Sequence, residues 1–199
     1  MEPEDERYNK ADYIRTTSAN LVSRAAKVYG AANVNLKGKS IVKPGAIIRG
    51  ELAAVRIGRY CMIAENAVIR PPYVLEPDEE DGGKMKVKFK PLLIGNSSCI
   101  GKNSVVEAGV MGTNVHVGDN CVLGASCTIH DNCYIEDGAV LPPGMVVPPF
   151  SRIGGIPARI LADMPESTAV VHRDRAAARF DHFKELDAEA GSVTAEKAD

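Results

Sequence analysis

Three cysteines and a histidine lie close together in the stretch VGDNCVLGASCTIHDNCYIEDGAV, and these are the side chains that could hold a metal ion or carry redox chemistry. Cys121, Cys127 and Cys133 are spaced six residues apart, with His130 between the last two. Structural zinc sites usually draw pairs of cysteines that are two to four residues apart, yet the sequence contains no C-x2-C pair. The spacing of six therefore points to a structural origin.

A period of six residues runs through much of the chain. Large aliphatic residues recur at Val117, Leu123, Ile129, Ile135, Leu141, Val147 and Ile153, and the same phase appears upstream at Ile57, Ile63, Ile94 and Ile100. Neither an amphipathic helix nor a hairpin repeats at six. A short parallel strand with a tight corner does, and three such units make one turn of a prism-shaped parallel β-helix. In that geometry the large aliphatic residue and the small residue four positions later both face the axis.

This geometry predicts where the reactive side chains lie. Cys61, Cys121, Cys127 and Cys133 occupy the small inward position, where a free cysteine packs as a compact hydrophobe. His130 and His116 flank inward residues, so we expect them to point outward as surface histidines. The sequence thus predicts core cysteines, no metal site and no cofactor.

Composition sets further bounds. With 199 residues the chain fits one domain, and a net charge of −2 gives no indication of nucleic-acid binding. No apolar run approaches the length of a membrane helix, and the opening MEPEDERYNK is charged where a signal peptide is apolar. We therefore expect no membrane insertion, a cytoplasmic location and reduced thiols without disulfides.

The period also divides the chain. We expect an N-terminal segment over residues 1–33, a parallel β-helix over 34–160 and a C-terminal helix with a disordered tail over 161–199. The β-helix is interrupted at 71–93, where two prolines stop a strand, an acidic EPDEEDGG turn follows and MKVKFK alternates like a hairpin arm. The expected helix begins near Asp174, with Ala177, Phe180, Phe183 and Leu186 as its apolar stripe.

The segment IIRGELAAVRIGRYCMIAENAVIR resembles the γ-class carbonic anhydrases, which bind zinc through three histidines between subunits. Matching the motifs of that family places Arg70 at the first histidine and Lys102 and Glu107 at the other two. Two cations and a carboxylate cannot replace three neutral imidazoles. The resemblance therefore implies a vacated site, and we expect Arg49, Glu51 and Arg70 to form a surface ion-pair cluster.

The hexapeptide acyltransferases share the repeat and often end in a segment like IGGIPARIL. These enzymes need a histidine base in a cleft between prisms, for which His116 and His130 are the candidates. Neither histidine has the expected sequence setting. A diverged hexapeptide-repeat enzyme, either an acyltransferase or a γ-carbonic-anhydrase-like protein, remains the alternative prediction, because a fold by itself implies no chemistry.

From YNKADYI through IIRGELAAVRIGR and VIRPP to LPPGMVVPPF, the chain resembles the dynactin subunit 5 family of pointed-end subunits. The resemblance implies an all-β, left-handed parallel β-helix of hexapeptide repeats with a C-terminal α-helix, and no catalytic residues. It also implies a scaffold role in dynein-driven cargo transport on the cytoskeleton. The partners would be dynactin subunit 6, the other pointed-end subunits including the actin-related cap protein, and dynein cargo adaptors.

The excursion is the expected place for partner binding. It combines aromatic and basic side chains beside a rigid β-helix, a composition that can supply anchor residues. The residues predicted to bind partners are Tyr73, Lys86, Lys88, Phe89 and Lys90. An ordinary solvated loop is the alternative interpretation of the same residues.

Overall fold

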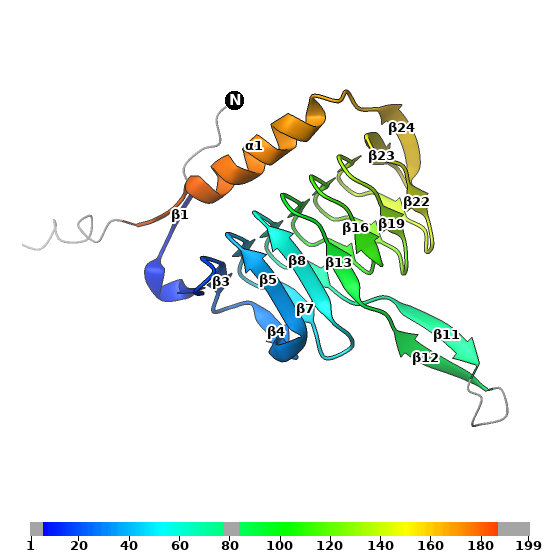
Figure 1. Ribbon diagram of the computed structural model, residues 1–199, viewed down its shortest axis with the longest axis horizontal. Coiled ribbons are helices and arrows are strands. Elements are labelled where there is room, and N and C mark those ends of the chain that lie inside the picture. Colours follow the sequence, from blue (N-terminus) through cyan, green and yellow to red (C-terminus); the bar gives the residue numbers. More distant parts are fainter. Residues whose placement is uncertain (1–5, 78–83, 187–199) are drawn as a thin grey trace, which may run out of the picture.

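The protein is a solenoid of short parallel strands with one α-helix lying along it (Figure 1). This computed structural model describes residues 6–77 and 84–186. Two six-stranded sheets and one nine-stranded sheet form the three faces of the solenoid, which has about six turns. The predicted all-β parallel β-helix with a C-terminal helix is confirmed.

Each turn of the solenoid contributes one strand to each sheet, and the antiparallel strands β2 (Tyr13–Arg15) and β24 (Arg159–Asp163) extend sheet 1 at its two ends. Sheet 1 contains β2 (Tyr13–Arg15), β3 (Leu21–Ser23), β6 (Ile41–Val42), β9 (Met62–Ile63), β14 (Cys99–Ile100), β17 (His116–Val117), β20 (Tyr134–Ile135), β23 (Ser151–Gly154) and β24 (Arg159–Asp163). Sheet 2 contains β4 (Lys27–Tyr29), β7 (Ile47–Arg49), β10 (Val68–Ile69), β15 (Val105–Val106), β18 (Val122–Leu123) and β21 (Val140–Leu141). Sheet 3 contains β5 (Val34–Gly38), β8 (Val55–Arg59), β13 (Leu92–Ile94), β16 (Val110–Met111), β19 (Thr128–Ile129) and β22 (Val146–Val147).

The core is a set of stacked aliphatic side chains along the solenoid axis. In sheet 1, for example, Ile100, Val117 and Ile135 are in register on successive strands and are each at most 1% exposed. All seven large residues of the predicted repeat from Val117 to Ile153 are buried in this way. Burial of such side chains contributes about 1.5–3 kcal/mol each, so the repeat supplies the stability of the fold.

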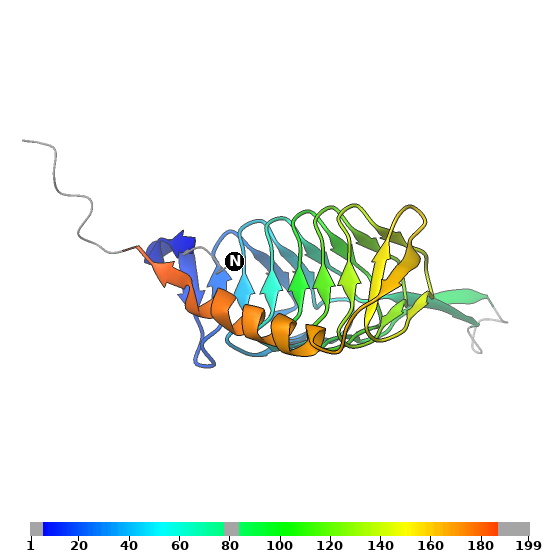
Figure 2. The ribbon, with the colours of Figure 1, turned by 90° about the horizontal axis from the view of Figure 1, so that it is seen from above.

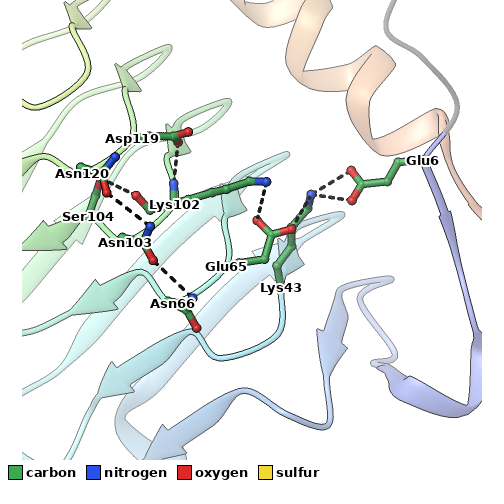
Figure 3. Close-up of polar contacts among 9 residues, drawn as sticks. All are labelled: Glu6, Lys43, Glu65, Asn66, Lys102, Asn103, Ser104, Asp119 and Asn120. Atoms are coloured by element: carbon green, nitrogen blue, oxygen red, sulfur yellow. Dashed lines mark hydrogen bonds and ion pairs between the residues drawn. The ribbon is translucent and has the colours of Figure 1, made fainter.

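Asparagines at the corners explain how so short a repeat can turn. Asn66, Asn103 and Asn120 have φ values of 58°, 54° and 56°, a left-handed conformation that asparagine tolerates better than most residues. Their side chains also form a ladder, because Asn66 Nδ2 donates to Asn103 Oδ1 and Asn103 Nδ2 donates to Asn120 Oδ1, both at 3.3 Å (Figure 3). The corners of neighbouring turns are thereby linked.

The solenoid begins earlier than predicted. Its first turn starts with β3 at Leu21, which pairs in parallel with β6, and not at residue 34. Val22, Val28 and Val34 do follow the period of six and pack against the core. They are only partly buried, because a terminal turn has a neighbouring turn on one side alone. Before this turn lie β1 (Glu6–Tyr8), the 3-10 turn η1 (Lys10–Asp12) and β2, and η2 (Ala31–Asn33) precedes β5.

The C-terminal segment runs back along sheet 1 as helix α1 (Thr168–Asp181) and ends in strand β25 (Phe183–Glu185), as Figures 1 and 2 show. The predicted helix from Asp174 through Leu186 is therefore wrong at both ends. Phe183 leaves the helix because β25 pairs with β1, where its ring stacks on Tyr8 at a centroid distance of 4.6 Å. The predicted disordered tail, residues 191–199, lies outside the described residues.

The excursion is a β-hairpin of β11 (Tyr73–Pro77) and β12 (Met85–Phe89), which are antiparallel. It leaves the solenoid after β10 of sheet 2 and returns at β13 of sheet 3. Both views show it standing out from the turns (Figures 1 and 2). The acidic turn of the excursion, residues 78–83, lies outside the described residues.

Candidate functional site

The hairpin has two faces of different character. Tyr73 pairs with Phe89 and Leu75 pairs with Val87, so these side chains project to the same side of the two strands. The rings of Tyr73 and Phe89 meet edge to face, with centroids 6.4 Å apart. Tyr73, Leu75 and Val87 are between 41% and 55% exposed, which makes this an apolar face open to solvent.

The lysines occupy the opposite face. Glu76 lies between two of them, with Lys90 Nζ at 2.6 Å and Lys88 Nζ at 3.0 Å from its carboxylate oxygens. These two bonds, Lys90 first, lower the pKa of the Glu76 carboxyl. Lys86 stands directly opposite Glu76 on the neighbouring strand.

The five predicted partner-binding residues thus share one hairpin but divide between two faces. Tyr73 and Phe89 belong to the apolar face, whereas Lys86, Lys88 and Lys90 belong to the charged one. Sequence reasoning missed the remaining members of the apolar face, which are Leu75, Met85 and Val87. The alternation of M-K-V-K-F carried this signal, since side chains two positions apart in a strand share a face.

The positions that the sequence motif predicted to be vacated zinc ligands are engaged in ion pairs. Arg70 Nη1 lies 3.0 Å from Glu107 Oε1, between neighbouring turns. Arg49 pairs separately with Glu51. The Arg49–Glu51 pair of the expected cluster is therefore present, whereas the inclusion of Arg70 is wrong, because Arg70 reaches along the solenoid to the next turn instead.

Lys102 belongs to a second polar cluster (Figure 3). Its Nζ lies 3.8 Å from Glu65 Oε2, and the buried Lys43 donates to Glu65 at 3.4 Å and to both carboxylate oxygens of Glu6 at 2.6 and 2.8 Å. Burial alone would raise the pKa of Glu65, but a main-chain hydrogen bond and the charges of Lys43 and Lys102 outweigh it and lower that pKa. Lys102 is thus held apart from the Arg70–Glu107 pair.

The cysteines are core residues. All five are buried and free, and burial raises the pKa of each thiol, to about 12 for Cys61 and Cys127. The Sγ atoms of Cys61, Cys121 and Cys133 each lie 3.0–3.1 Å from a carbonyl oxygen of the next turn. Thiols in this state are poor nucleophiles and poor metal ligands, because the reactive form is the thiolate.

The two histidines differ. His130 is exposed, as predicted, and its Nδ1 lies 2.8 Å from the Val147 carbonyl oxygen. His116 points outward from the solenoid as predicted, but it is half-buried and not a free surface histidine, because α1 covers this part of sheet 1. Its ring stacks on Tyr134 at 4.8 Å, and burial, with Arg179 and His172, lowers its pKa to about 4. A catalytic base in an open cleft between prisms would need a more exposed side chain than that of His116.

The described residues hold no group of three His, Cys, Asp or Glu side chains placed to bind a metal ion. Within the same ranges no helix is long and apolar enough to span a membrane. These findings leave the apolar hairpin face and the outer faces of the sheets as the candidate functional surfaces.

Solved structures with a similar fold are hexapeptide-repeat transferases. A hexapeptide transferase family protein from Anaplasma phagocytophilum has a TM-score of 0.58 and 18% identity, over 81% of this chain and 89% of that one. A mutant of perosamine N-acetyltransferase from Caulobacter crescentus, in complex with CoA and GDP-perosamine, has a TM-score of 0.55 and 20% identity, over 72% and 57%. At these identities the likeness shows the fold alone.

Sequence comparison is more specific. Dynactin subunit 5 of Dictyostelium discoideum is 36% identical over 113 residues, which are 57% of this chain and 54% of that protein. The match thus spans about half the length of that relative. The family model of dynactin subunit 5 matches residues 1–188. Since that match takes in every turn of the solenoid, the hairpin and helix α1, the chain belongs to the dynactin subunit 5 family.

Proposed function

We propose that the protein is a non-catalytic structural and adaptor subunit of the dynactin pointed-end complex. It acts in the cytoplasm, on the cytoskeleton, and supports dynein-driven cargo transport by binding partner subunits and cargo adaptors. The partners are dynactin subunit 6, the actin-related cap protein with the other pointed-end subunits, and the adaptors. Family membership supports the dynactin assignment, and the outer surface of the solenoid supports the binding role.

The observation that carries the binding role is an apolar ladder on the outer face of sheet 2. The side chains that alternate with the buried ones are in register from strand to strand: Ile47, Val68, Val105, Val122 and Val140. Val122 is 41% exposed and the others are half-buried, and α1 lies along sheet 1 and not along this face (Figures 1 and 2). An uninterrupted row of branched aliphatic side chains on a flat sheet is typical of a surface that another protein covers.

Sheet 3 offers a weaker version of the same surface. Its outer row contains Leu93, Val110 and Val146, but Thr128 interrupts it between the last two. Sheet 1 is covered by α1. The hairpin leaves the solenoid from the corner between sheets 2 and 3, so a partner on sheet 2 can also contact the apolar hairpin face. The rigid faces of a solenoid suit such docking, since they need little ordering on binding.

A pair of variants tests this assignment. Val122→Lys places a charge in the ladder, and Thr128→Lys places the same charge on the neighbouring face of the same turn. The purified variants are mixed with recombinant subunit 6 and the actin-related cap protein, and co-elution is followed by size-exclusion chromatography. We expect Val122→Lys to lose co-elution and Thr128→Lys to keep it. Full retention by Val122→Lys would contradict binding through sheet 2.

A further inference from the structure

A cavity lies between helix α1 and the outer face of sheet 1. Its volume is about 280 Å³, and its lining includes Cys99, His116 and Tyr134 from the sheet and His172, Arg175 and Arg179 from the helix. Four of these side chains are cationic or can become so. No aspartate or glutamate lines it among the described residues. The cavity is therefore a concave site with a surplus of N–H donors.

The two arginines have no carboxylate partner in the described parts of the chain. Along α1, Arg173 pairs with Asp174 at 3.3 Å, whereas no carboxylate oxygen among the described residues lies within 4.0 Å of Arg175 or Arg179. A guanidinium presents five N–H donors in a planar fork that suits oxyanions. Arg175 and Arg179 are four positions apart, so they project from the same side of α1.

The two histidines are held in fixed positions. The His116 ring is stacked on Tyr134 with an interplanar angle of 8°, and the His172 ring centroid is 6.5 Å away. His172 Nδ1 lies 2.9 Å from the Asn114 carbonyl oxygen. A carbonyl can only accept, so the proton is on Nδ1 and Nε2 is the second nitrogen of the ring.

The acidic groups nearest to His116 are engaged elsewhere. Asp119 Oδ1 accepts from the Lys102 main-chain N–H at 2.7 Å, and Asp137 Oδ1 accepts from the Asp119 N–H at 2.8 Å. Both aspartates line the neighbouring part of the groove with Glu65 and do not line this cavity, whereas His116 and Arg179 lie at the boundary and line both parts. The cationic end of the groove is thus left for a ligand.

We propose that this cavity binds a phosphate group, held by the guanidinium groups of Arg175 and Arg179 and by the imidazole of His116, with the His172 ring forming part of the wall. A carboxylate has two oxygens, whereas a phosphate group presents three or four, which matches two guanidinium forks and one imidazole N–H. The source is either inorganic phosphate or a small phosphate monoester, and the volume has room for the larger ligand. Because the donors come from both α1 and sheet 1, binding stabilises the docked helix.

The test is thermal unfolding and isothermal titration of the full chain with inorganic phosphate and with glycerol 3-phosphate, against sodium chloride at equal ionic strength. We expect both phosphates, but not chloride, to raise Tm. In Arg175→Gln and Arg179→Gln the affinity falls about tenfold or more, as expected for loss of a charge-assisted bond. Arg173→Gln, on the same helix, keeps wild-type affinity. Tighter binding of glycerol 3-phosphate identifies the monoester as the source, and equal or weaker binding identifies inorganic phosphate.

A second readout guards against misfolded variants. In the wild-type protein, the imidazole C2–H resonances of His116 and His172 should shift with phosphate, while that of His130 should not. The proposal is overturned if chloride reproduces the rise in Tm, if Arg173→Gln weakens binding as much as Arg179→Gln, or if the two cavity histidines do not respond. None of these outcomes depends on assembly with dynactin subunits, so they leave the proposed function untouched.

Discussion

Arg70 and Glu107 form an ion pair, 3.0 Å long, that joins two neighbouring turns of the solenoid. These are two of the positions that the sequence motif predicted to be vacated zinc ligands. The pair is a contact between neighbouring turns of one chain. Its side chains are 39% and 21% exposed, so solvent screens the attraction in part.

The first prediction concerns the strength of this pair. A double-mutant cycle with Arg70→Met and Glu107→Gln should give a coupling free energy of about 1 kcal/mol or less, as for other partly exposed pairs. Urea unfolding of the four proteins measures it. Zinc added to the wild-type chain should leave its Tm unchanged. A coupling of several kcal/mol, or stabilisation by stoichiometric zinc, would contradict this account of the site.

The second prediction separates two cysteines that sit at equivalent inward positions. Cys121→Ser should change the free energy of unfolding little, because its hydroxyl can donate to the Glu136 carbonyl oxygen that Cys121 Sγ now approaches at 3.0 Å. Ser104 already makes the same kind of bond, to Gly118 O at 2.8 Å. Cys127 is fully buried and has no such acceptor among the described contacts, so Cys127→Ser should cost about 1–3 kcal/mol. Equal losses of stability in urea would refute the distinction.

The third prediction is a loss of stability in acid that depends on His116. The pKa of this residue is lowered to about 4 in the folded protein, by burial first and then by Arg179 and His172 on α1, against the smaller opposing effects of Asp137 and Asp119. The folded state therefore binds fewer protons than the unfolded state between these values. The stability that the neutral form of His116 gives the folded state is fully present above pH 6.5 and is lost as the pH falls towards 4.

In urea titrations across that range, the His116 contribution amounts to about 3 kcal/mol, from 1.36 kcal/mol per pKa unit. His116→Gln should flatten the acid limb of the profile. The matched control is His130→Gln, which removes an exposed histidine and should keep the wild-type profile. An unchanged acid limb in His116→Gln would show that other groups cause the loss.

The fourth prediction concerns the hairpin. Leu75→Ser with Val87→Ser removes the centre of its apolar face, and these side chains are 55% and 51% exposed. The stability of the isolated chain should stay within about 0.5 kcal/mol, as for other surface changes, while adaptor or subunit binding falls. Lys88→Ser, on the charged face, is the control and should bind as wild type. If a pull-down shows that Lys88→Ser loses binding while Leu75→Ser with Val87→Ser keeps it, the contact lies on the charged face instead.

The sequence predicts the core of the protein better than its surface. The inward positions and the burial of four cysteines follow from the period of six alone, because each turn must place the same kind of residue at the same place. The burial of His116 does not follow, since it depends on where α1 lies. The exit of Phe183 from the helix depends on pairing between β1 and β25, which are far apart in the chain.

The hairpin illustrates a similar limit. Its alternation is visible in MKVKF, but the apolar face becomes evident only from the pairing of Leu75 with Val87. The first turn escapes prediction for a different reason. Val22, Val28 and Val34 keep the period, yet polar residues of a terminal turn surround them and obscure the pattern.

The most direct test of the scaffold role is to purify the tagged chain from its own cytosol under a moderate-salt wash and to quantify the proteins that accompany it. We predict that subunit 6, the actin-related proteins and the remaining dynactin subunits are recovered in fixed proportion. Recovery of the chain alone, as a homotrimer free of dynactin subunits, would contradict the proposed function and would favour the alternative of a diverged hexapeptide-repeat enzyme.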